Sequence, residues 1–99
     1  MTDERCEQGE LHRVRGDLLN AIGDGVTAEQ SYHQALLVVR SQGARVFELR
    51  AAISLARLWR DQGKRTEARD LLAPVYGWFT EGFDMPVLQD AKGLLDQLA

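Results

Sequence analysis

The amino-acid sequence predicts an all-α protein of five helices, on three observations. Apolar residues recur at spacings of three and four along the chain, and no segment alternates polar and apolar residues with period two. The prolines, Pro74 and Pro86, both lie in the last third, so most of the chain is free of helix breakers. Short glycine-containing turns separate the helical stretches. At 99 residues, the chain has the length of one domain with a thin core.

The first helix is expected at 4–22, where apolar residues are spaced by three and four. This stripe consists of Cys6, Leu11, Val14, Leu18, Leu19 and Ile22. The Gly-Asp-Gly segment 23–25 then ends the helix. Thr27 and Gln30 form a capping box, so Thr27 is the predicted N-cap of a second helix that runs to about Gln42. The apolar face of the second helix carries Tyr32, Ala35, Leu36 and Val39.

The third and fourth helices are expected at about 45–62 and 66–80, on either side of the turn 63–65. Thr66 is the predicted cap of the fourth helix, and Pro74 predicts a kink or break inside it. The inward faces carry Leu49, Ala52, Leu55, Ala56 and Trp59 on the third helix and Ala68, Leu71, Leu72 and Val75 on the fourth.

The fifth helix is expected at about 85–98. Asp84 is its predicted cap, and Pro86 falls in the first turn, where a missing N–H costs nothing. Its apolar stripe consists of Val87, Leu88, Ala91, Leu94, Leu95 and Leu98. We expect this helix to cap the open end of the preceding helices, with its charged residues outward.

The first four helices repeat one pattern at a period of 40 residues. Small residues let paired helices approach closely, at Gly16, Ala28, Ala56 and Ala68. Large residues fill the gaps between the helices, at Leu19, Tyr32, Trp59 and Leu72. We therefore expect Trp59 to be buried between the two helix pairs. The chain is assigned as one domain, 1–99, with repeat one at about 4–42, repeat two at about 44–80 and a capping helix at about 85–98.

This pattern resembles the tetratricopeptide repeat family, whose motif is Trp-x2-Leu-Gly-x2-Tyr, then Ala-x3-Phe, then Pro. The first repeat reads His12-x2-Arg15-Gly16-x2-Leu19, then Ala28-x3-Tyr32; the second reads Ala52-x2-Leu55-Ala56-x2-Trp59, then Ala68-x3-Leu72. Arg40 and Thr80 replace the closing proline, and the period of 40 exceeds the usual value of about 34. The resemblance, over residues 9–76, implies a right-handed α-solenoid of two repeats whose first helices line a concave groove.

A narrower resemblance covers residues 46–83. The segments 49–52, 55–59 and 71–83 are similar to the carboxyl-terminal end of large bacterial signalling proteins. Those proteins join a class III adenylate or guanylate cyclase domain to an ATPase module and a helical repeat tail. The resemblance implies that the chain is the tail alone, because Gly63-Lys64 lacks the upstream glycine and the following serine or threonine of a phosphate-binding loop.

Composition argues against several classes of function. The net charge of −3 argues against non-specific nucleic-acid or membrane binding, and no apolar run approaches the ~20 residues of a membrane span. No secretory leader opens the chain, so we expect a cytoplasmic protein. Cys6 has no cysteine partner, and neither His12 nor His33 has a second ligand at metal-binding spacing. No serine has a paired base, so we expect no catalytic residue, cofactor or metal.

Charge is distributed unevenly and points to a candidate groove. Residues 40–69 carry a net charge of +5, whereas 1–39 and 70–99 each carry −4. In the register of the family, the groove residues are Arg13, Asp17, Asn20, Arg50, Ile53, Arg57 and Arg60. Arginine forks suit carboxylates, so the expected partner is a protein or an acidic peptide. The alternative is that some of these arginines pair internally with Asp17, Glu48 or Asp61.

An aromatic cluster is a second candidate surface. Trp78, Phe79 and Phe83 either form an exposed apolar docking patch or pack the fourth helix against the fifth. The sequence thus favours a non-catalytic protein–protein interaction module that binds a partner in the groove or associates with itself. The alternatives are a regulatory tail of a nucleotide cyclase or ATPase signalling protein and an RNA-binding helical repeat. The negative net charge and the lack of aromatic residues among the arginines count against RNA.

Overall fold

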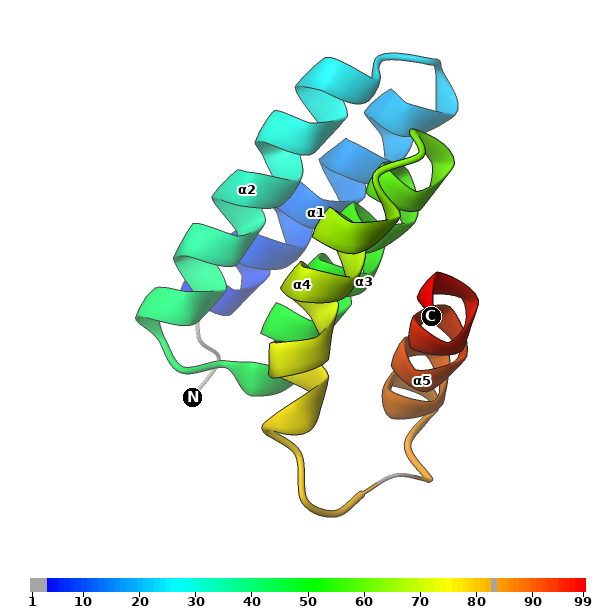
Figure 1. Ribbon diagram of the computed structural model, residues 1–99. Coiled ribbons are helices and arrows are strands. Elements are labelled where there is room, and N and C mark those ends of the chain that lie inside the picture. The colour runs from blue at the N-terminus through cyan, green and yellow to red at the C-terminus, as the bar shows by residue number, and fades with distance from the viewer. Residues whose placement is uncertain (1–3, 83) are drawn as a thin grey trace.

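The computed structural model describes residues 4–82 and 84–99, with side chains from Gly9 onwards. Within these ranges it contains the helices α1 (Glu4–Ala21), α2 (Gly25–Ser41), α3 (Arg45–Asp61), α4 (Arg65–Gly77) and α5 (Pro86–Leu98) (Figure 1). No strand occurs in the described parts of the chain. The prediction of an all-α protein with five helices is therefore confirmed.

The first three turns close in the same way. Gly23, Gly43 and Gly63 have φ angles of 90°, 66° and 81°, a region that glycine enters without a steric penalty. After the first of them, the Asp24 amide donates to the Leu19 carbonyl at 2.9 Å, and equivalent bonds after the other two measure 3.1 and 2.7 Å. This is the Schellman arrangement of a helix C-terminus. The turns predicted at these glycines are confirmed.

The helix caps differ from those predicted. Asp24, not Thr27, caps α2, and its Oδ1 accepts a hydrogen bond from the Thr27 amide at 3.1 Å. Thr66 and Asp84 do not cap their helices, because neither α4 nor α5 has a side-chain capping bond. Both α2 and α4 begin two residues after the turn glycine. The threonines therefore already lie inside the first helical turn.

The C-terminal half of α4 also differs from the prediction. The helix continues past Pro74, so the expected break does not occur, and it ends before Thr80. Pro74 removes one backbone donor, but Leu72 and Val75 are buried in the core on either side of it and hold the segment in place. Gly82, with φ of 80°, then forms the predicted turn before α5.

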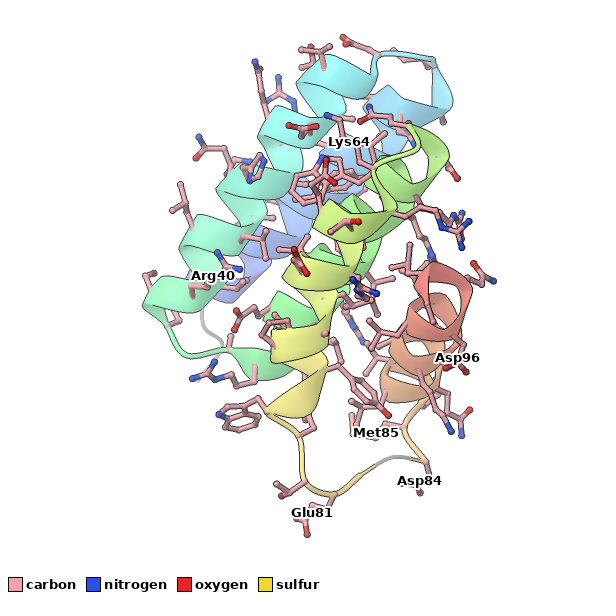
Figure 2. All side chains as sticks on the ribbon, in the orientation of Figure 1. Arg40, Lys64, Glu81, Asp84, Met85 and Asp96 are labelled. Atoms are coloured by element: carbon pink, nitrogen blue, oxygen red, sulfur yellow. The ribbon has the colours of Figure 1, made fainter. Side chains whose placement is uncertain are left out.

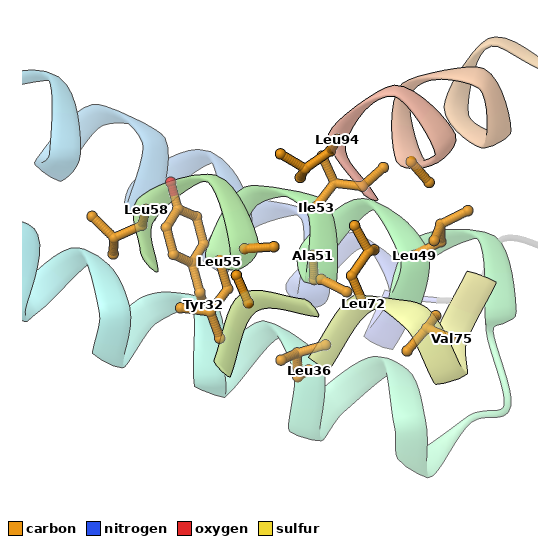
Figure 3. Close-up of a cluster of buried hydrophobic side chains, with 14 of the residues drawn as sticks. Tyr32, Leu36, Leu49, Ala51, Ile53, Leu55, Leu58, Leu72, Val75 and Leu94 are labelled. Atoms are coloured by element: carbon orange, nitrogen blue, oxygen red, sulfur yellow. The ribbon is translucent and has the colours of Figure 1, made fainter. Parts of the chain in front are cut away.

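α3 lies at the centre of the fold. It packs against α2 and α4, and both α1 and α5 contact it (Figure 1). Leu49 and Leu55 of this helix are fully buried, and Leu72 of α4 lies in the same cluster (Figure 3). Of the small residues predicted at the repeating positions, Ala28, Ala56 and Ala68 are 0% exposed, and Gly16 is also buried. Their burial agrees with the role predicted for them between paired helices.

α1 packs on α2 through glycines. A Cβ atom on Gly16 would lie 2.5 Å from Cε1 of Tyr32, and one on Gly9 would lie 2.6 Å from Cγ1 of Val39. Both glycines are buried, and Tyr32 is only 2% exposed. The missing side chains therefore let α1 pack closely on α2, at Tyr32 and at Val39.

Most of the apolar stripe of α1 consequently points away from the core. The exposed fractions are 68% for Leu11, 44% for Val14, 64% for Leu18 and 78% for Ile22. Leu19 packs against the core cluster, and the side chain of Cys6 lies outside the described residues. The apolar stripe therefore does not mark the buried face of α1. The face that carries Gly9 and Gly16 is the buried one.

Trp59 lies between the two helix pairs, as predicted, but it is half-buried rather than fully buried. Its Nε1 donates to Oε1 of Glu29 at 2.9 Å, and its ring centroid lies 6.0 Å from that of His33. The indole N–H thereby reaches a carboxylate near the surface, while the ring packs against the core. Leu72, at the equivalent large position in α4, is fully buried.

Candidate protein-binding groove

A shallow groove lies where α1, α3 and α5 meet. It has a volume of about 260 Å³ and is lined by Arg13, Arg50, Ile53, Ser54, Arg57, Pro86, Val87 and Asp90. Four of the seven groove residues predicted from the sequence are therefore brought together. α3 supplies three of these because residues 50, 53 and 57 share one helical face. α5 forms the opposite wall, which the sequence register did not include.

The groove continues along α3 and α5 into a second depression of about 220 Å³. Arg57 and Asp90 line both depressions, so the two form one surface. Arg60, another predicted groove residue, lies in the second depression. Its Nη1 donates to Oε1 of Gln97 at 2.7 Å, and its Nε donates to Asp61 at 3.1 Å.

Asp17 and Asn20 do not line either depression. Oδ1 of Asp17 accepts a hydrogen bond from the Tyr32 hydroxyl at 2.5 Å, which ties α1 to α2. Burial raises the pKa of Tyr32 well above its usual range, and the bond to Asp17 raises it further. Asn20 is exposed near the end of α1. The sequence thus placed both residues correctly on α1, but Asp17 has a structural partner.

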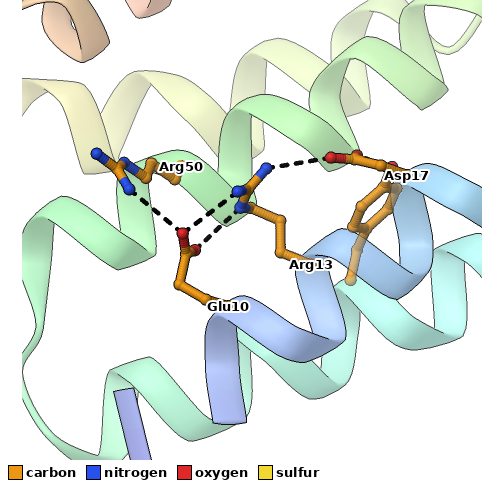
Figure 4. Close-up of polar contacts among 5 residues, drawn as sticks. Glu10, Arg13, Asp17 and Arg50 are labelled. Atoms are coloured by element: carbon orange, nitrogen blue, oxygen red, sulfur yellow. Dashed lines mark hydrogen bonds and ion pairs between the residues drawn. The ribbon is translucent and has the colours of Figure 1, made fainter. Parts of the chain in front are cut away.

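Glu10 is the charged residue of this region that the sequence interpretation missed. Figure 4 shows it between two arginines: it accepts from Nε of Arg13 at 2.9 Å and from Nη1 of Arg50 at 3.2 Å. The hydrogen bond that Arg13 donates to Glu10 raises the pKa of Arg13, and Asp17 accepts from the same guanidinium at 3.1 Å. The repeat contained a signal for this contact. Positions 10 and 50 are one period of 40 residues apart, so they lie side by side on adjacent helices.

The groove is consequently less basic than the clustering of arginines predicts. Arg13, Arg50 and Arg60 each pair with a carboxylate. Glu48, by contrast, pairs outside the groove, with Arg40 and Arg45. Among the groove arginines, Arg57 has no ion pair or hydrogen bond within the described part of the chain, and it is exposed. It is the cation that a ligand reaches without displacing an internal partner.

The aromatic cluster is divided between solvent and core. Trp78 is exposed, and its ring meets Phe79 edge-on at 5.2 Å between centroids. The Arg45 guanidinium lies 4.8 Å from the centroid of Trp78. Phe79 is partly buried against the core, and Phe83 lies outside the described residues. Trp78 forms the edge of a depression of about 370 Å³ between α3 and α4, beside Pro74 and Glu48.

No group of three or more His, Cys, Asp or Glu residues that could hold a metal ion occurs in the described ranges. Those same ranges include no helix with the length and apolar character that crossing a membrane requires. Comparison of the chain with family models, with curated proteins and with solved structures gives no match.

Proposed function

We propose that the chain is a non-catalytic helical repeat module of the tetratricopeptide type, which binds a partner protein in the groove between α1, α3 and α5. In this proposal α1–α2 and α3–α4 are the two repeats of a right-handed α-solenoid, and α5 caps it. The equivalent turn glycines, the buried small residues and the Glu10–Arg50 contact between equivalent positions support this arrangement.

The observation that carries the groove assignment is the position of Arg57. This exposed cation has no ion pair within the described residues, and it lines the same groove as the apolar side chains of Ile53 and Val87. An extended peptide with one carboxylate flanked by aliphatic side chains fits this combination. Because Arg13 and Arg50 are already paired with Glu10, the expected ligand is moderately acidic rather than highly charged.

The test is a selection from a displayed random-peptide library with the chain as target. We expect the selected peptides to be enriched in an Asp or Glu next to an aliphatic residue. Binding of a fluorescent selected peptide is then measured by anisotropy. Arg57→Glu should weaken it by about tenfold or more, because a repulsive charge replaces the attractive one. Binding should also weaken as salt is added, since exposed charges are largely screened from one another beyond about 10 Å at 0.1 M ionic strength.

Arg69→Glu is the matched control. Arg69 is exposed on α4 and lines none of the depressions, so the variant changes the net charge by the same amount without touching the groove. Its peptide affinity should equal that of the wild type. Selected peptides without an acidic preference, or equal losses in both variants, would show that the groove is not the binding site.

A further inference from the structure

The two long walls of the groove carry opposite free charges. Each wall is one face of a helix, with residues spaced by three, four and three: positions 50, 53, 57 and 60 of α3, and positions 87, 90, 94 and 97 of α5. In both helices the lower numbers line the first depression and the higher numbers the second, so α3 and α5 run in the same direction. Arg57 and Asp90 line both depressions and therefore lie at the same level, on opposite walls.

Asp90 is the acidic counterpart of the free arginine. It is exposed and makes no ion pair or hydrogen bond within the described residues. The acids of α1 beside the first depression already have partners: Glu10 accepts from Arg13 and Arg50, and Asp17 accepts from Arg13. The groove thus presents one open cation on α3 and one open anion on α5.

A ligand that meets both open charges carries an acidic and a basic group close together. A carboxylate that pairs with Arg57 would, by itself, face the like charge of Asp90 across the groove, which is unfavourable. A basic residue beside the carboxylate turns this repulsion into an attraction. Successive side chains of an extended peptide point to opposite sides, so neighbouring residues reach opposite walls.

We propose that Asp90 is a specificity-determining residue of the groove, which selects peptides that carry a lysine or arginine within two positions of their acidic residue. This inference rests on the proposed function, because it concerns the ligand of the same groove. Ile53 and Val87 line only the first depression, so the aliphatic residue of the peptide lies at that end. Uniformly acidic segments are disfavoured, and so is a nucleic-acid strand, whose phosphates bring no cation to Asp90.

The experiment selects the same displayed random-peptide library in parallel on the wild type and on Asp90→Lys. Peptides selected on the wild type should carry a lysine or arginine within two positions of the Asp or Glu, and those selected on the variant should lose it. In fluorescence anisotropy, Asp90→Lys should bind a wild-type-selected peptide about tenfold more weakly, because repulsion replaces attraction. Replacing the basic residue of that peptide by glutamate should restore binding to the variant.

Asp96→Lys is the matched control. Asp96 is exposed on α5, lines neither depression and projects away from α4 (Figure 2). This variant should select the same peptides as the wild type. Far-ultraviolet circular dichroism checks that each variant is helical. Asp90→Asn repeats the test with a side chain of the same size, and its affinity should fall about twofold to fivefold.

The outcomes separate the role of Asp90 from the groove assignment. Peptides that keep the acidic–aliphatic pair but show no basic preference would overturn the role of Asp90 and leave the groove standing. So would equal or tighter binding of the wild-type-selected peptide by Asp90→Lys or Asp90→Asn, or an equal loss in Asp96→Lys. Peptides with no acidic preference at all would overturn both proposals.

Discussion

The helices α1 and α5 flank the central helix α3 and use their apolar residues in opposite ways. α5 buries Leu88, Leu94 and Leu98 against α3 and α4 and exposes its charges. α1 buries two glycines and exposes its aliphatic stripe. The difference teaches that apolar periodicity identifies a helix but not its buried face. Where another face of the helix carries small residues that let two helix backbones approach closely, that face can be the buried one.

The largest expected effect is at the α5 end. Leu88 is 1% exposed, so Leu88→Ala should lower the free energy of unfolding by about 2–5 kcal/mol, the range for leucine truncation in a core. Urea denaturation followed by circular dichroism measures it. A loss under about 1 kcal/mol would mean that α5 is only loosely attached, because exposed positions tolerate such changes.

Glycine substitutions in α1 and α5 test how closely each helix packs on its neighbours. Gly16→Ala should lower the free energy of unfolding by about 1–3 kcal/mol, because the new Cβ would lie 2.5 Å from the Tyr32 ring. Gly93→Ala in α5 is the control: no atom lies within 4 Å of its new Cβ. Alanine should therefore stabilise that helix, by up to about 1 kcal/mol. Thermal melts of the two variants should shift in opposite directions, and a stabilised Gly16→Ala would mean that α1 packs differently.

The Tyr32–Asp17 bond tests how α1 is fixed to α2. Tyr32→Phe should cost about 1 kcal/mol of stability, the usual worth of a hydrogen bond. The pKa of Tyr32 is raised in the fold from its ordinary value of 10.0. Above that pH the unfolded chain releases the proton and the folded chain keeps it, so the wild type loses stability as pH rises.

Tyr32→Phe lacks this contribution to the pH dependence. Melting temperatures of the wild type and the variant between roughly neutral pH and pH 11 measure the difference. The wild type should lose more stability than the variant above pH 10. Parallel curves would show that the tyrosine is equally free to ionise in both states.

The smallest expected effect is on the exposed face of α1. Leu18→Ala should change the free energy of unfolding by less than about 0.5 kcal/mol, because Leu18 is 64% exposed. Comparison with Leu88→Ala is direct, because the same side chain is truncated at each end of the fold. Similar losses at both sites would contradict the exposure of Leu18.

Much of the fold was predictable because glycine turns and helical periodicity are local signals. The positive φ angles of Gly23, Gly43 and Gly63 occur where the turns were expected. The cap at Asp24 was missed because Thr27 also fits a capping motif, and only the start of the helix decides between them. The side of α1 that faces the core was missed because it depends on the packing of Gly16 against the Tyr32 ring. These two residues lie sixteen positions apart in the sequence.

Part of the candidate site was also predictable, from the repeating pattern of the sequence. The repeat register brought Arg13, Arg50, Ile53 and Arg57 to one groove. The register also places positions 10 and 50 one period apart, but it does not show whether their side chains pair, so the neutralisation of Arg50 by Glu10 was missed. The wall formed by α5 lies outside the repeat altogether, and helical periodicity alone does not orient it.

Amide-resolved NMR of the labelled chain, titrated with a selected acidic peptide, tests the proposed groove most directly. The account predicts chemical-shift changes along the α3 segment from Arg50 to Arg60 and the facing segment of α5 from Pro86 to Gln97. The amides from Leu11 to Ile22 should not shift on addition of peptide. Peptide-induced shifts centred on these amides, with none along Arg57 and its neighbours, would contradict the proposed groove.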